Sequence, residues 1–158
     1  MEKIFKFVVF LSFFSLNEVF ASNFVDKGFY VIDLKSKVEW LKCSVGQQWS
    51  DTKQNCLGFA IKLDHEGIKE ANKILNEQIE GEWRLPKRKE LESLICKECK
   101  EAKINKELFP NTPAEPFWTS QRNWWSPKFF WSVNFFTGHS YGRFVPEKKL
   151  YVRFLRER

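Results

Sequence analysis

The sequence has little of what catalytic and metal sites are built from. Only two of its 158 residues are histidines, His65 and His139, and they stand far apart along the chain. A structural zinc site takes about four ligands, usually Cys and His, and a cysteine nucleophile needs a histidine beside it. Neither arrangement is visible, so we expect no enzyme activity, no bound metal and no cofactor.

The chain also lacks an apolar run that could span a bilayer, which takes about 20 residues. Its longest run, residues 7–16, follows two lysines and is followed by Asn17 and Glu18. Val19-Phe20-Ala21 comes next, and its first and third residues stand at the two positions that a signal peptidase requires to be small. We predict a cleavable signal peptide, residues 1–21, and one exported domain, residues 22–158. An uncleaved membrane anchor is the alternative.

Internal repeats, linkers and low-complexity segments are absent, and the length suits one domain. All seven Trp lie after residue 21, and the net charge is +6 with or without residues 1–21, which hold two Lys and two Glu. A basic, Trp-rich exported domain suits an anionic or glycan partner in the periplasm or outside the cell. The alternative is that the charge keeps the protein soluble while Trp fills its core. Nucleic acid is not expected, because the protein leaves the cytoplasm.

The four cysteines are expected to pair, as they usually do in exported chains. Three pairings are possible, and we favour Cys43 with Cys56 and Cys96 with Cys99. The second pair is a C-x-x-C motif, which can also be a redox pair or half of a zinc site. It follows a predicted helix instead of starting one, so it lacks the helix start that lowers a thiol pKa, and we favour a structural disulfide.

Hydrophobic periodicity predicts an α+β domain with two helices and antiparallel strands. We expect an opening hairpin, residues 24–34 and 37–42, then a loop to Cys56 and a helix over residues 63–79 capped by Asp64. A second helix is expected to begin at Pro86. The remaining expectations are a loop over residues 96–116 and strands over residues 130–135, 141–145 and 150–155.

Several fragments, taken in order, resemble one family. They are Cys43-Ser44-Val45-Gly46-Gln47-Gln48-Trp49, Trp83-Arg84-Leu85-Pro86 with Glu90-Leu91, Ile104-Asn105, Phe109-Pro110-Asn111-Thr112, Phe117-Trp118-Thr119-Ser120, Trp131-Ser132-Val133-Asn134-Phe135 and Tyr151-Val152-Arg153-Phe154-Leu155-Arg156. In this order they are similar to the Lcl C-terminal domain family of exported bacterial proteins. The resemblance covers nearly all of residues 22–158 and implies a fold similar to C-type lectins.

The family takes its name from a collagen-like adhesin that binds sulfated glycosaminoglycans and forms trimers through a collagen-like stalk. This chain has no Gly-x-y repeat, so neither the adhesin role nor the trimer is carried over to it, and no oligomeric state is predicted. The calcium-dependent sugar motifs E-P-N and W-N-D of C-type lectins are also missing, since Glu115-Pro116 is followed by Phe117.

Trp83-Arg84-Leu85-Pro86 with Glu90 is the most specific fragment, and we expect it to be structural. Trp83 and Leu85 would face the core. Glu90 would reach the amides at the helix start or pair with Arg84. A ligand role for Arg84 or Glu90 is the alternative.

Basic and aromatic side chains supply the candidate ligand-binding surface, because Lys and Arg bind sulfate and carboxylate groups and exposed Trp can stack on sugar rings. The candidates are Lys87, Arg88, Lys89, Trp124, Trp125, Arg143, Lys148 and Lys149, with Arg153, Arg156 and Arg158 expected in the same basic cluster. A solvated face is the alternative.

Together these features predict an exported, non-catalytic binding module for an anionic glycan or polymer, or for a partner protein of the cell envelope. One alternative is a thiol–disulfide or metal-handling protein that uses Cys96 and Cys99. Another is a structural accessory subunit.

Overall fold

A computed structural model describes residues 23–158, and the predicted signal peptide lies outside the described residues. Two helices and mostly antiparallel strands confirm the α+β prediction. In chain order the elements are β1 (Phe24–Asp26), β2 (Tyr30–Asp33), β3 (Val38–Leu41), β4 (Gln48–Ser50), β5 (Asn55–Leu57), β6 (Lys62–Leu63), α1 (His65–Gln78), α2 (Arg88–Glu92), β7 (Pro116–Arg122), β8 (Phe130–Asn134), β9 (His139–Phe144), β10 (Leu150–Tyr151) and β11 (Leu155–Glu157).

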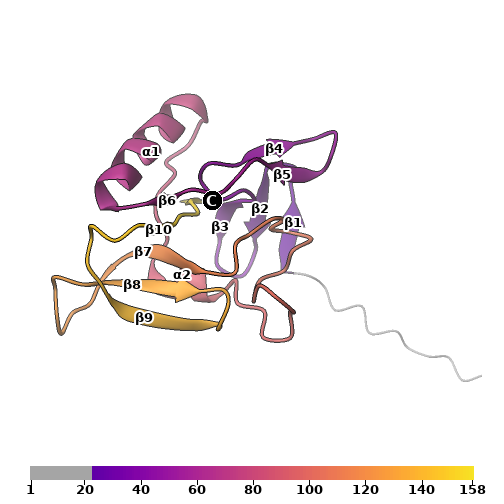
Figure 1. Cartoon of the computed structure of the whole chain (residues 1–158). Helices are drawn as coiled ribbons and strands as arrows, with labels where there is room; N and C mark the ends of the chain where they lie inside the picture. Colours follow the sequence, from indigo (N-terminus) through magenta and orange to yellow (C-terminus); the bar gives the residue numbers. More distant parts are fainter. Residues whose placement is uncertain (1–22) are drawn as a thin grey trace, which may run out of the picture.

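The strands form two sheets and one separate hairpin. The first sheet has the order β1-β2-β3-β11, and the second has the order β6-β10-β7-β8-β9. The hairpin pairs β4 with β5. Figure 1 shows α1 at the upper left, the second sheet below it, and the hairpin above the first sheet. Because β10 belongs to the second sheet and β11 to the first, the last residues of the chain join the two sheets.

Side chains that alternate along the strands fill two hydrophobic clusters, since successive residues of a strand point to opposite faces. Phe117 of β7 packs with α2 and the first sheet, while its neighbour Trp118 packs beneath α1. In the same way Leu155 packs in the cluster around α2, and its neighbour Phe154 packs in the cluster beneath α1. Each sheet therefore separates the two halves of the core.

The first helix, α1, confirms the prediction to within two residues at each end. Asp64 caps it, and its carboxylate accepts a hydrogen bond from the Gly67 amide at 2.8 Å. Near the end of α1, the side chain of Asn76 accepts from the amide of Trp83, which lies beyond the helix, at 2.7 Å and donates to the Trp83 carbonyl at 3.0 Å. These bonds fix the chain between α1 and α2 and hold Trp83 in the core.

Four strand predictions need correction. The expected strand over residues 24–34 divides into β1 and β2 at Gly28, which has a φ of 79° and allows the chain to reverse. The expected loop between Cys43 and Cys56 contains the β4–β5 hairpin, and β7 was not predicted. The expected strand over residues 150–155 divides into β10 and β11, because residues 152–154 cross from one sheet to the other.

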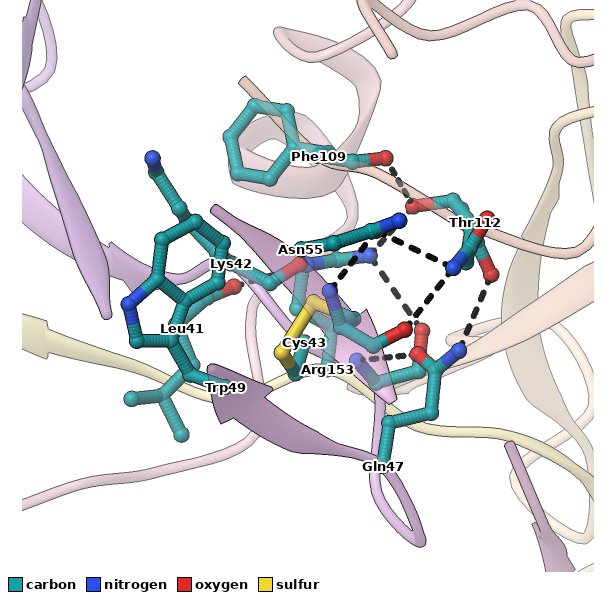
Figure 2. Close-up of a disulfide and its surroundings, with 12 residues drawn as sticks. Leu41, Lys42, Cys43, Gln47, Trp49, Asn55, Phe109, Thr112 and Arg153 are labelled. Carbon is teal, nitrogen blue, oxygen red and sulfur yellow. Dashed lines mark hydrogen bonds between the residues drawn. A yellow bond between two sulfur atoms is a disulfide. The ribbon is translucent and has the colours of Figure 1, made fainter. Parts of the chain in front are cut away.

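At this crossing the side chain of Arg153 is completely buried. Its guanidinium donates to the carbonyls of Leu41, at 2.7 Å, and Lys42, and to the hydroxyls of Ser44, at 3.2 Å, and Thr112, at 2.6 Å. Figure 2 shows hydrogen bonds of this network beside the disulfide of Cys43. Burial lowers the pKa of Arg153 to about 9, so the group still carries its charge at neutral pH.

We predict that Arg153→Ala lowers the free energy of unfolding by about 3 kcal/mol, because it leaves a cavity and buried acceptors without donors. Urea denaturation measures the change. The matched control is Arg158→Ala at an exposed position, which should change stability by less than about 0.5 kcal/mol. A variant of Arg153 as stable as the parent would show that this network contributes little.

Candidate functional site

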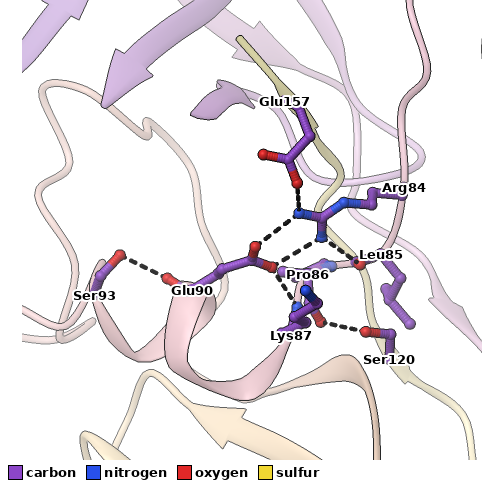
Figure 3. Close-up of polar contacts among 8 residues, drawn as sticks. All are labelled: Arg84, Leu85, Pro86, Lys87, Glu90, Ser93, Ser120 and Glu157. Atoms are coloured by element: carbon purple, nitrogen blue, oxygen red, sulfur yellow. Dashed lines mark hydrogen bonds and ion pairs between the residues drawn. The ribbon is translucent and has the colours of Figure 1, made fainter. Parts of the chain in front are cut away.

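In the Trp83-Arg84-Leu85-Pro86 fragment, Trp83 and Leu85 face the core and Arg84 pairs with Glu90, as expected. Trp83 is buried and Leu85 packs against the same cluster. Arg84 donates to both oxygens of Glu90, with Nη2–Oε1 at 2.7 Å and Nη1–Oε2 at 2.9 Å, and also pairs with Glu157. Figure 3 shows this pair between α2 and the last strand. The side chains of Arg84 and Glu90 are therefore occupied within the domain.

The second helix begins at Arg88 and not at Pro86, for a reason visible in the same network. The Pro86 carbonyl accepts from the Ser120 amide at 2.8 Å, so it belongs to the edge of β7. Glu90 accepts from the Lys87 amide at 2.6 Å, which makes Lys87 the residue before the helix. Burial raises the pKa of Glu90, but the bonds from Arg84 and the Lys87 amide outweigh it and hold that pKa below its ordinary value.

We predict that Arg84→Ala destabilises the protein by about 2 kcal/mol at neutral pH, because a charge-assisted bidentate pair is lost. The pKa of Glu90 is lower in the folded state, so the pair stabilises the fold above the unfolded-state pKa and its contribution is lost as pH falls. The difference between parent and variant in chemical denaturation should therefore shrink in acid. The exposed pair of Lys69 with Glu66 gives the control, and Lys69→Ala should cost less than about 0.5 kcal/mol.

Both favoured disulfides are present. Cys43 bonds to Cys56, and Cys96 bonds to Cys99. Such bonds indicate an oxidising compartment. The Cys96–Cys99 turn follows α2 and is closed by the Cys99 amide, which donates to the Cys96 carbonyl at 3.4 Å, while the Cys96 amide donates to the Lys103 carbonyl at 3.0 Å. Lys103 Nζ donates to the Cys99 carbonyl at 2.9 Å, which places a cation beside the C-x-x-C motif.

We predict that all four cysteines resist alkylation in the native protein and that intact mass rises only after denaturation and reduction. The Cys43–Cys56 bond closes the longer loop and is worth about 3 kcal/mol, and the Cys96–Cys99 bond about 2 kcal/mol, in the chain-entropy description. Opening of Cys96–Cys99 alone under mild reductant would instead favour thiol–disulfide chemistry.

The predicted basic candidates lie on two parts of the chain, on α2 with the residue before it and on β9 with the segment after it. Arg88 stacks on Trp131, 4.3 Å from the ring centroid, and lies 3.3 Å from Glu92, which also pairs with Lys89 at 3.1 Å. Lys87 is exposed beside them, and Arg143, Lys148 and Lys149 are exposed on β9 and the segment after it.

Two of the arginines expected in the C-terminal basic cluster are unavailable to a ligand, which corrects that prediction. Arg153 is buried, as described above. Arg156 pairs with Glu39 at 2.7 Å and lies over the Trp83 ring at 4.7 Å. Arg153 lies in the crossing between β10 and β11, where residues 152–155 are all buried, and the carboxylate of Glu39 engages Arg156.

The predicted aromatic candidates are brought together. Trp124 and Trp125 stack with ring centroids 3.9 Å apart and are 69% and 72% exposed. Their loop joins β7 to β8 and is held by Asn123, whose amide donates to the Phe129 carbonyl at 2.8 Å. The Asn123 side chain donates to the Gly142 carbonyl at 2.8 Å and accepts from the Trp125 amide at 3.0 Å.

A small charged pocket of about 430 Å³ lies at the start of α1 and includes Asp64, Glu147 and Arg122. His65 lines it, with its ring 3.9 Å from that of Phe130, and its buried Nε2 has no hydrogen-bond partner. Burial, then the charges of Arg122 and Lys69, lower the pKa of His65. His139, the other histidine, is exposed at the start of β9.

A larger groove of about 810 Å³ lies between α1 and β4, and the sequence did not reveal it. The periodic residues of α1 predicted a buried face, but within α1 only Ile68 is buried. Ala71 and Leu75 are partly buried against the core and also line the groove, where Ile74 lies beside them. The spacing of the periodic residues indicated an apolar helix face that packs against other residues. In the structure part of that face is exposed in the groove.

Within the described part of the chain, no group of three or more His, Cys, Asp or Glu side chains could hold a metal ion. Residues 23–158 also contain no helix long and apolar enough to cross a membrane.

The Lcl C-terminal domain family matches residues 29–156. The chain belongs to this family. The match runs from the first sheet to β11, so this Lcl C-terminal domain includes both disulfides, the Arg84–Glu90 pair, the Trp124–Trp125 loop and the groove. No curated protein and no solved structure matches the chain. The resemblance to C-type lectins therefore stays a prediction.

Proposed function

We propose that this Lcl C-terminal domain is an exported, non-catalytic binding module whose Trp124–Trp125 loop recognises an anionic glycan or polymer of the cell envelope. The observation that carries the proposal is the stacked and exposed pair of indoles. A large exposed aromatic surface is unfavourable in water and is typical of a binding site. Export through residues 1–21, into the periplasm or outside the cell, belongs to the same proposal and agrees with the two disulfides.

The loop presents the indoles in a fixed position. Besides the Asn123 contacts, the Ser126 amide donates to the Asn123 carbonyl at 3.2 Å and the Phe129 amide donates to the Ser126 carbonyl at 2.9 Å. A loop already ordered by its own hydrogen bonds loses little conformational entropy when a ligand binds. The two rings together offer a flat apolar face on which the ring of a sugar can stack.

Cations stand at the base of this loop. Arg122 stacks on Phe130, 4.5 Å from its centroid, and donates to the Pro127 carbonyl at 2.9 Å. Lys128 Nζ lies 5.0 Å from the Phe129 centroid, and Arg143 is the exposed neighbour of Gly142, which the Asn123 side chain contacts. Stacking on the indoles and attraction to these cations would together select a sugar polymer that carries negative charge.

We predict that the protein is retained on immobilised heparin at low salt and that Trp124→Ala with Trp125→Ala weakens this binding by about 30-fold, the effect of losing an aromatic hot spot. Melting temperature should stay unchanged, because both side chains are exposed. Phe136→Ala removes an equally exposed aromatic at 65% and serves as the matched control.

A sulfonate cation exchanger separates stacking from simple charge. The double variant should elute from it as the parent does, because no charge has changed. No retention of the parent on heparin or on any envelope polyanion would contradict the proposal, and so would equal heparin binding by the double variant.

A partner protein of the envelope is the other ligand class that this surface suits, since Trp is enriched at the centres of protein interfaces. Thiol–disulfide chemistry is the second candidate function, and the observation that favours it is the Lys103 ammonium beside the Cys99 carbonyl. The alkylation experiment described above decides it.

A further inference from the structure

The groove between α1 and β4 lies apart from the Trp124–Trp125 loop and shares no lining residue with it. Its apolar surface includes Leu41, Leu75 and Phe154, and the rings of Phe29 and Trp49 stand along it. We propose that the groove binds an extended, uncharged and apolar peptide segment of a partner protein, which adds as a strand to the free edge of β4.

The edge of β4 is open on the side of the groove. Within the described residues β4 pairs with β5 only. Gln48 and Trp49 are consecutive and so point to opposite faces of the strand, yet both line the groove, whereas no residue of β5 does. The groove therefore runs along the strand edge, where the backbone can donate and accept hydrogen bonds with an added strand.

The charge of the groove selects the kind of segment. Asp51 is its only titratable lining side chain apart from the disulfide-bonded Cys43, and the Asp51 carboxylate already accepts from Trp49 Nε1 at 2.8 Å. In the pocket beside His65, by contrast, six of the eight lining residues are ionisable. A charged side chain in the groove would lose its hydration and would find at most the one carboxylate of Asp51, so an uncharged segment fits best.

The wall that carries Trp49 is rigid. Lys42 Nζ lies 4.3 Å from the Trp49 centroid and is itself fixed by Asp26 at 2.6 Å. The disulfide at Cys43 and the Arg153 network hold the same stretch of chain, and Figure 2 shows both beside it. A fixed strand edge is ready to pair without the entropic cost of ordering it first.

Exposed apolar side chains line the groove, and another lies next to one of its walls. Phe29 and Ile74, which line the groove, remain 38% and 42% exposed. Gly46 also lines it, and a Cβ there would lie 2.7 Å from the Phe59 carbonyl, so the chain at Phe59 packs directly on this wall. Phe59 itself is 89% exposed. An apolar segment in the groove would cover surface that now faces water.

The test is a selection from displayed random eight-residue peptides on the purified protein, followed by amide chemical-shift mapping with the enriched peptide. We expect enrichment of uncharged, alternating apolar sequences and shifts at residues 48–50 and 74–78. Ile74→Glu should weaken binding by about tenfold or more, because it places an uncompensated charge in the groove. Val145→Glu is the matched control, since Val145 is equally exposed at 42% and lies outside the groove.

A copy of the enriched peptide that is N-methylated at alternate positions tests the strand pairing, because it keeps the side chains but loses backbone donors. It should bind at least about tenfold more weakly. Equal binding by the methylated copy, equal enrichment on Ile74→Glu, selection of charged peptides, or shifts of the same size with a neutral detergent would each overturn the proposal. Heparin binding by the Trp124 and Trp125 variants is read separately, so the two proposals fail independently.

Discussion

The rest of the structure depends on the hydrogen bonds that the buried guanidinium of Arg153 donates. This guanidinium lies where the chain leaves the second sheet for the first, and it bonds the end of β3 through Leu41 and Lys42. It also bonds Ser44 beside the first disulfide and Thr112 in the long loop before β7. All four acceptors are neutral oxygens, so polar bonds and the Phe109 ring, 4.9 Å away, must offset the burial of the charge.

The crossing at Arg153 places consecutive residues of the chain in both hydrophobic clusters. Val152 and Phe154, on either side of Arg153, enter the cluster beneath α1, while Leu155 enters the cluster around α2. The Arg84–Glu90 pair then ties α2 to Glu157 at the end of β11. The last residues of the chain thus contact both clusters, and Arg153 among them bonds to residues 41, 42, 44 and 112.

The features that could be predicted from the sequence are local. Asp64 caps α1 through a bond to the amide three residues on, and Glu90 reaches back to Lys87 in the same way. The features that were missed depend on distant partners. Nothing near Arg153 in the sequence distinguishes it from the exposed Arg143, because what buries it is chain more than forty residues away. The candidate site was therefore predictable for the adjacent pair Trp124–Trp125 and not for the groove, whose walls come from separate segments.

The constraints are distributed unevenly between the two candidate surfaces. The Trp124–Trp125 loop is held in position by the hydrogen bonds of Asn123 and its neighbours. The wall of the groove between Leu41 and Trp49 is held by a disulfide, an ion pair and the Arg153 network at once. Strong constraint on an open strand edge is not needed to fill a core, since that edge contacts no other strand of the described chain. Such constraint is useful on a surface that must present backbone groups in register to another chain. This supports assigning recognition of a peptide to the groove and recognition of a polymer to the loop.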